Sequence, residues 1–397
     1  MLRIIAIDEL QPGMYVNAVT EQTGSLRIRS RGVVKTEKAI EALRLKGVLK
    51  LEVDETKGIS TAPVEAAPAP KPAPKPAPKP AQKPVKEQLE QATKLYEQAK
   101  GIHRGFLKRI QKDQKIDLDR VNTLSHDIID NVFDTPNALS CLSLMQKSDE
   151  YLLEHSLNCS ILMAMFARHL DLDTQEIADL AMGALLMDIG MANVPRDIID
   201  KKGPLTATER DIISTHVDVG LDIVERCGDA PAIVRDLIYN HHERIDGSGY
   251  PDKKEGDKVS FHARMAGIVD SYDAMVSPRS HQNPIPATAA LKSLLKNPGY
   301  DQDLVQKFVQ CLGVHPVGSL VKLTNERLAI VIRANAKKPL QPIVATFYHL
   351  KSGHYAETKM LDLSKVSEEI ERSVRPEEFG LNLTKFFREV FLDTLPD

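Results

Sequence analysis

The sequence predicts a mainly α protein: a multi-helix bundle with a small α/β domain before it and a small β-containing cap after it. Three features indicate this fold class. Apolar side chains recur at helical spacing almost without interruption from about residue 85 to 275. A proline-rich stretch separates this region from the first 58 residues, and strand-like segments follow from Val317. A chain of 397 residues has room for two or three domains.

Residues 1–58 form the first predicted domain, a small α/β unit. Residues 3–7 and 48–53 are rich in β-formers and predict strands, whereas residues 36–46 have the spacing of a helix. Nothing in this domain indicates catalysis.

A linker is predicted at residues 59–85. Nine prolines lie between Pro63 and Pro84, with Ala and Lys at most of the other positions. Such a segment cannot bury enough apolar surface to fold, and it favours extended polyproline II. A spacer is the favoured interpretation, and a proline-rich ligand for a partner domain is the alternative.

The helical domain is predicted at residues 86–316 and the cap at 317–397. Helix breaks are expected at Pro136, 171–174, Pro195, 203–204 and 228–231. Thr206 and Glu209 form a capping box, and the helix that carries His216 is expected to begin there. In the cap, strands are expected at 328–333 and 343–349 and a closing helix at 381–391.

Composition excludes several function classes. The 52 Lys and Arg residues nearly balance 55 Asp and Glu residues, so binding to a nucleic-acid polymer is not expected. The four cysteines are far apart, which argues against a disulfide framework or a thiolate zinc site and fits a reducing compartment. No signal peptide or membrane span is expected, so a cytoplasmic location is predicted.

Histidines and carboxylates gather in the helical domain. They occur at His155, Asp188, His216, His241-His242, 246–251, and Asp270 with Asp273. Imidazole and carboxylate ligands suit iron, manganese, nickel or zinc, and a bundle builds a metal site from side chains on several helices. A single histidine such as His155 is more often packed or exposed than a ligand. The adjacent pair His241-His242 is a stronger signal, because both rings face inward only near a helix end.

Asp188 is the most informative carboxylate, because it lies in the apolar run 185–190. Burying an unpaired carboxylate costs several kcal/mol. The sequence therefore predicts a cation beside Asp188.

An ordered set of motifs resembles the HD-GYP family over roughly residues 150–315. The motifs are Asp188-Ile189-Gly190, Thr215-His216, His241-His242-Glu243, Asp246-Gly247-Ser248-Gly249-Tyr250-Pro251, Val269-Asp270-Ser271-Tyr272-Asp273-Ala274 and Gly313-Val314-His315-Pro316-Val317-Gly318. Residues 1–58 also resemble the small N-terminal domain often attached to bacterial members. The resemblance implies an HD-type bundle that hydrolyses cyclic di-GMP, a bacterial second messenger, with iron or manganese ions.

The resemblance also assigns roles to residues. Catalytic roles fall to Asp188, as the carboxylate that bridges ions, and to Asp273 behind the ligands, and substrate contacts fall to Arg279 and Tyr250. The implied metal ligands are His155, Asp188, His216, His241, His242 and Asp270. The turn Gly249-Tyr250-Pro251 is implied to meet partner domains that carry diguanylate cyclase (GGDEF) activity.

The chain departs from the family pattern at four positions. Met187 replaces the histidine of the histidine-aspartate pair, Met191 replaces a lysine, Tyr151 replaces a glutamate, and Gln282 replaces a basic residue. A thioether binds hard ions poorly, so one or two divalent ions per chain are expected rather than three. Met187 and Met191 are expected to share a helix face and to pack against apolar neighbours.

Two functions follow from these residues. The first is a metal-dependent phosphodiesterase that converts cyclic di-GMP to pGpG and onward to GMP. The second is a catalytically impaired module that serves as a cyclic di-GMP receptor or docks diguanylate cyclase domains. The sequence leaves open which metal binds, what the N-terminal domain does, and whether the chain forms a homodimer through helices such as 85–108.

Overall fold

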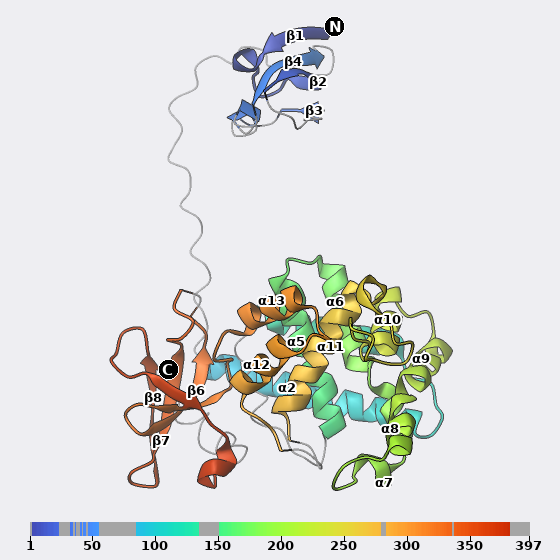
Figure 1. The fold of residues 1–397 in the computed structure, drawn as a ribbon, viewed down its shortest axis with the longest axis vertical. Helices are drawn as coiled ribbons and strands as arrows, with labels where there is room; N and C mark the ends of the chain where they lie inside the picture. Colours follow the sequence, from blue (N-terminus) through green and yellow to red (C-terminus); the bar gives the residue numbers. More distant parts are fainter. Residues whose placement is uncertain are drawn as a thin grey trace. The chain divides into compact units, whose positions relative to one another are not determined.

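The computed structural model describes residues 2–23, 32–34, 36, 40–41, 43–44, 47–54, 85–134, 151–278, 283–335 and 337–381. The chain divides into two compact units, residues 1–81 and 82–397. The second unit is mostly helical (Figure 1), and the prediction of a mainly α protein is confirmed.

The first unit is built on an antiparallel sheet with the strand order β1-β4-β2-β3. Its strands are β1 (Leu2–Ala6), β2 (Tyr15–Gln22), β3 (Gly32–Val33) and β4 (Val48–Asp54). β1 pairs with β4 in the register Leu2↔Asp54, which confirms the two predicted strands. Alternate residues such as Ile5, Leu51 and Val53 are buried, so one face of the sheet carries the core of this unit.

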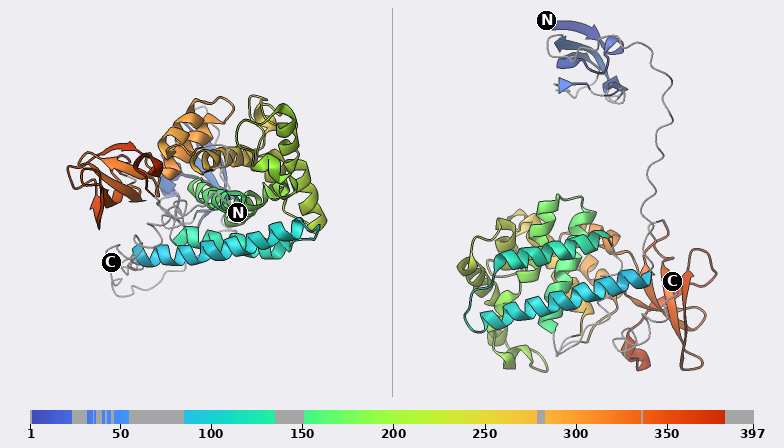
Figure 2. Two further views of the ribbon diagram at one scale, coloured as in Figure 1. Left: turned by 90° about the horizontal axis from the view of Figure 1, so that it is seen from below. Right: turned by 180° about the vertical axis from the view of Figure 1, so that it is seen from behind.

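The second unit contains a bundle of helices followed by a sheet (Figures 1 and 2). In chain order the helices are α2 (Val85–Ile110), α3 (Leu118–Asp134), α5 (Tyr151–His169), α6 (Thr174–Leu186), η4 (Ile189–Asn193), α7 (Arg196–Ile199), α8 (Ala207–Ser214), α9 (His216–Cys227), α10 (Ala232–Asn240), η5 (Gly256–Lys258), α11 (Phe261–Val276), α12 (Ala287–Lys296) and α13 (Gln302–Leu312). None of the helices in the described residues combines the length and the apolar character needed to span a membrane.

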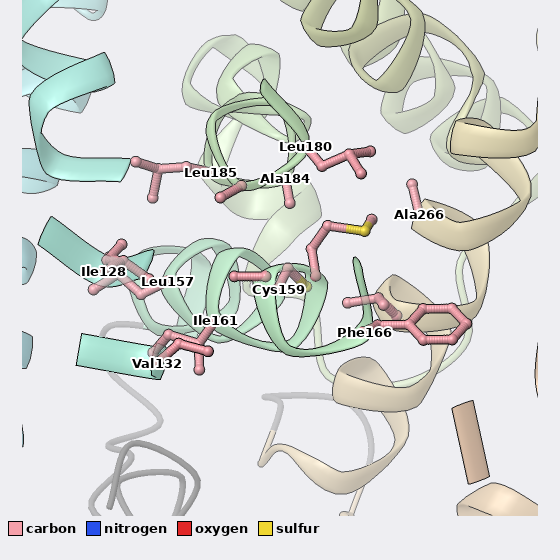
Figure 3. Close-up of a cluster of buried hydrophobic side chains, with 14 of the residues drawn as sticks. Ile128, Val132, Leu157, Cys159, Ile161, Phe166, Leu180, Ala184, Leu185 and Ala266 are labelled. Carbon is pink, nitrogen blue, oxygen red and sulfur yellow. The ribbon is translucent and has the colours of Figure 1, made fainter. Parts of the chain in front are cut away.

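α5 lies at the centre of the bundle and is buried along most of its length. α3, α6 and α11 surround it, and Figure 3 shows their apolar side chains meeting around Leu157, Cys159 and Phe166. A helix enclosed on all sides needs a continuous apolar surface. The exceptions on α5 are polar residues such as His155 and Asn158, which are buried for a different reason.

Helix ends fall where the sequence predicted them. Asp173 caps α6 by accepting a hydrogen bond from the amide of Glu176. The capping box is confirmed, because Glu209 N donates to Thr206 Oγ1 and Thr206 N donates to Glu209 Oε2. The expectation that this helix carries His216 is wrong, because α8 ends at Ser214 and His216 begins α9. Gly228 ends α9 with a φ of 155°. Pro136 and Cys141 lie outside the described residues.

The C-terminal strands form an antiparallel sheet with the order β8-β7-β6-β5-β9. The strands are β5 (Leu320–Leu323), β6 (Arg327–Arg333), β7 (Ile343–His349), β8 (His354–Asp362) and β9 (Ile370–Ser373), followed by η6 (Pro376–Phe379). Both predicted strands of the cap are confirmed as β6 and β7. Ile330 and Phe347 belong to the same core as the helices, so this sheet packs directly on the bundle. The predicted closing helix lies outside the described residues, apart from Leu381.

Candidate metal centre

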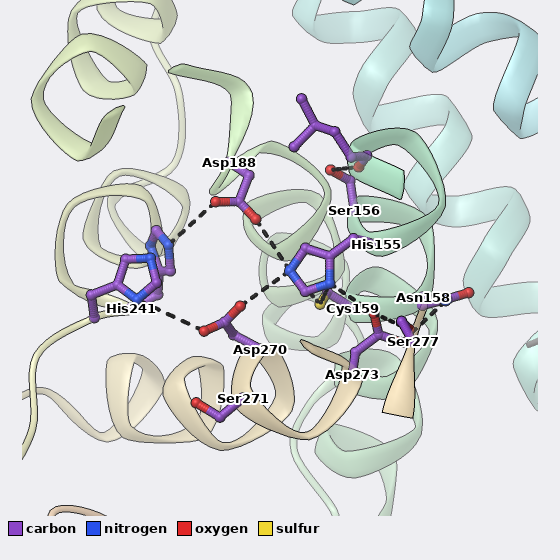
Figure 4. Close-up of polar contacts among 12 residues, drawn as sticks. His155, Ser156, Asn158, Cys159, Asp188, His241, Asp270, Ser271, Asp273 and Ser277 are labelled. Carbon is purple, nitrogen blue, oxygen red and sulfur yellow. Dashed lines mark hydrogen bonds and ion pairs between the residues drawn. The ribbon is translucent and has the colours of Figure 1, made fainter. Parts of the chain in front are cut away.

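The predicted ligands come from five elements that meet around Asp188 (Figure 4). His155 lies on α5, Asp270 lies on α11, and Asp188 lies in the turn between α6 and η4. His216 is the first residue of α9, and His241-His242 follow the last residue of α10. The expectation that the paired histidines sit at a helix end is confirmed.

One ligand group consists of Asp188, His216, His241 and His242, whose ligand atoms lie within 4.8 Å of one another. Asp188 Oδ1 is 3.3 Å from His216 Nε2 and 3.7 Å from His241 Nε2. The two Nε2 atoms are 3.3 Å apart. The rings therefore converge on one point beside the carboxylate.

The tautomers of these two rings follow from their other contacts. His216 Nδ1 donates to the carbonyl of Ile213 at 2.8 Å, and His241 Nδ1 donates to the carbonyl of Leu237 at 2.9 Å. A carbonyl only accepts, so in each neutral ring the proton sits on Nδ1 and the Nε2 lone pair is free. Burial lowers the pKa of His216, which favours the neutral ring. The two Nε2 lone pairs and the Asp188 oxygen thus face one another. These electron-rich atoms repel one another unless a cation lies between them.

The second group consists of His155, Asp188 and Asp270. His155 Nε2 is 3.1 Å from Asp270 Oδ1 and 3.2 Å from Asp188 Oδ2. Asp188 therefore turns one oxygen towards each group. Burial opposes a charged imidazole, yet the neighbouring Cys159, Tyr151, Asp188 and Asp270 hold the pKa of His155 well above its usual value. A bound divalent ion would take the place of that proton.

Asp273 lies behind His155. Its Oδ2 is 2.7 Å from His155 Nδ1 and accepts from Ser277 Oγ at 3.1 Å, while its Oδ1 accepts from Asn158 Nδ2 at 3.1 Å. Tyr96 on α2 donates to Asn158 Oδ1 at 3.2 Å. This chain of hydrogen bonds orients the imidazole towards the centre. Sequence reasoning missed Asn158 and Ser277, although their spacing of three and four residues from His155 and Asp273 was visible.

A further cluster of His155, Cys159 and Asp273 has ligand atoms at similar distances. Burial raises the pKa of the Cys159 thiol to about 12, so the sulfur keeps its proton and is a poor ligand. Both oxygens of Asp273 already accept hydrogen bonds. Cys159 and Asp273 therefore position His155 and do not form a separate metal site.

The turn after α10 covers the open side of the centre. His242 is 19% exposed, and its Nδ1 is 3.8 Å from Asp270 Oδ2. The ring of Tyr250 stacks on His242 with centroids 4.6 Å apart. The buried carboxylate of Glu243 accepts from the amides of Asp252 at 2.7 Å and Lys254 at 2.9 Å, which fixes the turn.

Gly249 allows the chain to close over the histidine pair. A Cβ at this position would collide with the amide of Arg244 and the carbonyl of His242. Tyr250 is thereby held at the rim of the centre.

Met187 and Tyr151, two of the positions that depart from the family pattern, pack beside the ligands and belong to neither ligand group. Met187 is 0% exposed and belongs to the apolar core. The expectation that Met187 and Met191 share a helix face is wrong, because α6 ends at Leu186 and η4 begins at Ile189. Tyr151 stacks on the ring of His155 with centroids 5.3 Å apart. Arg279 and Gln282 lie outside the described residues.

The candidate site lies within a part of the chain that matches a known domain family. The family model described as an HD domain matches residues 140–304, and a domain of unknown function (DUF3391) matches residues 2–121. A cyclic di-GMP phosphodiesterase of Pseudomonas aeruginosa is 31% identical over 374 residues, which cover 93% of this chain and 90% of that protein. The chain belongs to the HD-GYP family.

Other proteins match a smaller share of this chain. A cyclic di-GMP phosphodiesterase of Thermotoga maritima is 28% identical over 185 residues, so the match spans half of that protein's length. A solved HDGYP protein of Bdellovibrio bacteriovorus aligns with a TM-score of 0.47 and 15% identity, over 78% of this chain and 98% of that one.

Proposed function

We propose that this protein is a metal-dependent phosphodiesterase that hydrolyses cyclic di-GMP to the linear dinucleotide pGpG. The observation that supports the proposal most directly is the convergence of His216 Nε2, His241 Nε2 and Asp188 Oδ1, with the two Nε2 atoms 3.3 Å apart. The relative that matches along nearly its whole length is named for cyclic di-GMP hydrolysis.

The ligand residues fit one or two divalent ions. Nitrogen and oxygen donors are compatible with iron or manganese, which the family resemblance implies. One ion would be held by Asp188, His216, His241 and His242, and a second by His155, Asp188 and Asp270. Such ions lower the pKa of a water molecule and neutralise the phosphodiester that it attacks.

The chain's own residues orient the reactants. Asp273 fixes the ring of His155, and the carbonyls of Ile213 and Leu237 fix those of His216 and His241. Tyr250 lies over His242 at the rim and offers a flat surface to a guanine base. Arg279 is proposed to hold the phosphate, as its place in the family motif implies.

The test is an anaerobic assay of purified protein loaded with iron or manganese, with cyclic di-GMP as substrate and separation of pGpG from GMP. Asp188→Asn should abolish turnover, because this residue faces both ligand groups. Asp303→Asn on α13 is the control that should retain it. A loaded wild-type protein that leaves cyclic di-GMP intact would refute the proposal.

A second function is favoured by one observation, the burial of Met187 in the core where the family has a ligand. In that case the protein binds cyclic di-GMP without cleaving it, or docks a diguanylate cyclase domain through Gly249-Tyr250-Pro251. Calorimetry that detects nucleotide binding without turnover, together with turnover gained by Met187→His, would support this second function.

A further inference from the structure

One buried histidine stands outside the ligand groups described above. His103 on α2 is 1% exposed, and neither Nδ1 nor Nε2 has a hydrogen-bond partner. Its ring meets the edge of Phe106, with centroids 6.4 Å apart. A buried polar atom without a partner costs about 1–3 kcal/mol, so such an imidazole is rarely kept for packing alone.

The rest of the buried face of α2 shows that an apolar residue would fit at position 103. Its buried positions recur every three or four residues apart from the adjacent pair Ala99-Lys100, and they are Leu89, Ala92, Tyr96, Ala99, Lys100, His103, Phe106 and Ile110. The two other polar side chains on this face are paired. Tyr96 donates to Asn158, and Lys100 forms an ion pair with Glu154 at 2.7 Å.

The position of His103 connects it with the metal centre. α2 packs against η4, the short helix that begins immediately after Asp188. Burial lowers the pKa of His103 to about 4, and the charge of Asp188 acts in the opposite direction. The imidazole is therefore neutral at physiological pH, which is the form that binds metal ions.

The group on the α5 side of the centre has room for a further ligand. His155, Asp188 and Asp270 supply one nitrogen and two oxygens. Met187 occupies the position where the family has a further ligand. Its side chain packs in the core, and a thioether is a weak ligand for a hard ion. Three protein ligands leave at least one coordination position open.

We propose that His103 is a ligand of the Asp188 metal centre and supplies from α2 the imidazole that position 187 lacks. His103 lies outside both ligand groups in this structure. Its ring therefore has to move towards the centre when the ion binds. The proposal rests on the metal centre of the proposed function but not on the identity of the substrate.

The test measures metal binding without nucleotide. Full-length His103→Leu, stripped with a chelator, is titrated with Mn²⁺ by calorimetry, and the ions per chain are counted by elemental analysis. We expect the Mn²⁺ affinity of one site to fall by about 10–100-fold or more, since changes behind the ligands already cost this much. The metal-free variant should melt no lower than the wild type, because leucine fills an apolar position.

Two further variants make the result decisive. His169→Leu, which removes an exposed histidine at the end of α5, should bind Mn²⁺ like the wild type. His103→Phe, which keeps an aromatic ring beside Phe106 but has no lone pair to bind a metal ion, should lose the same Mn²⁺ affinity as His103→Leu. If His103→Leu binds as many ions as the wild type with equal affinity, the proposal is overturned. If Mn²⁺ binding depends on His103 but cyclic di-GMP is not cleaved, only the proposed function fails.

Discussion

Asp273 Oδ2 lies 2.7 Å from His155 Nδ1 and thereby turns the opposite nitrogen of the ring towards Asp188 and Asp270. Because Asn158 and Ser277 hold the same carboxylate, the ring is fixed by residues of two helices. The direction of a key nitrogen thus depends on a residue that lies behind it.

Asp273→Asn should weaken metal binding by about 10–100-fold, because an amide accepts the His155 proton less strongly and loses its orienting charge. Calorimetric titration with Mn²⁺ measures the change. Asp257→Asn removes an exposed carboxylate of η5 and is the matched control. Equal affinity in Asp273→Asn and wild type would show that the ring is oriented without this carboxylate.

Gly190→Ala should destabilise the protein by about 1–3 kcal/mol or more, because the added Cβ meets the carbonyl of His216 and the amide of Gly220. The backbone of η4 must approach α9 this closely for Asp188 to reach His216. Gly101→Ala is the control, since nothing lies within 4 Å of a Cβ there and a helical alanine should add about 0.5–1 kcal/mol. Urea unfolding of both variants gives the comparison, and a Gly190→Ala protein as stable as the wild type would contradict the close approach.

Substitutions of Met187 should behave like those of an apolar core residue. Met187→Ala should cost about 2–5 kcal/mol, whereas Met187→Leu should cost less than about 1.5 kcal/mol. Both variants should bind Mn²⁺ as the wild type does, because the thioether faces the core. A loss of metal affinity in Met187→Leu would instead identify the sulfur as a ligand.

The capping box of α8 predicts a pH dependence of stability. Hydrogen bonds from Lys201 and from the Thr206 amide lower the pKa of Glu209 from 4.5 to about 2. The folded state therefore releases this proton more readily than the unfolded state does. The resulting stabilisation is complete above about pH 4.5 and is lost as the pH falls towards 2.

Glu209→Gln should consequently lie below the wild type in unfolding free energy at neutral pH and approach it in acid. Urea midpoints between about pH 3 and pH 7 test this. Glu225→Gln, at an exposed position of α9, controls for the loss of a surface charge. A constant difference between Glu209→Gln and wild type across this range would be evidence against a shifted carboxylate.

Much of the centre could be predicted because its signals are local. A carboxylate in an apolar run pointed to Asp188, and adjacent histidines before a turn pointed to His241-His242. The packing of Met187 in the apolar core was also predicted. Its separation from Met191 could not be predicted, because it depends on α6 ending at Leu186 rather than continuing.

The role of α2 could not be read from spacing either. Its contacts with Asn158, Glu154 and η4 join residues separated by more than fifty positions. Such contacts depend on how the helices pack, which periodicity within one helix does not reveal. The fold class could therefore be predicted from the sequence. The packing of α2 against η4 beside the centre could not.

The position of α2 also determines which fragment of the chain contains the complete metal centre. The HD domain match begins at residue 140, while α2 falls within the match at residues 2–121. Structurally, α2 belongs to the unit that starts at residue 82. A fragment cut at the HD boundary would keep every ligand predicted from the sequence, yet it would lose α2 and with it His103. A fragment that keeps the centre closed must therefore begin at or before α2.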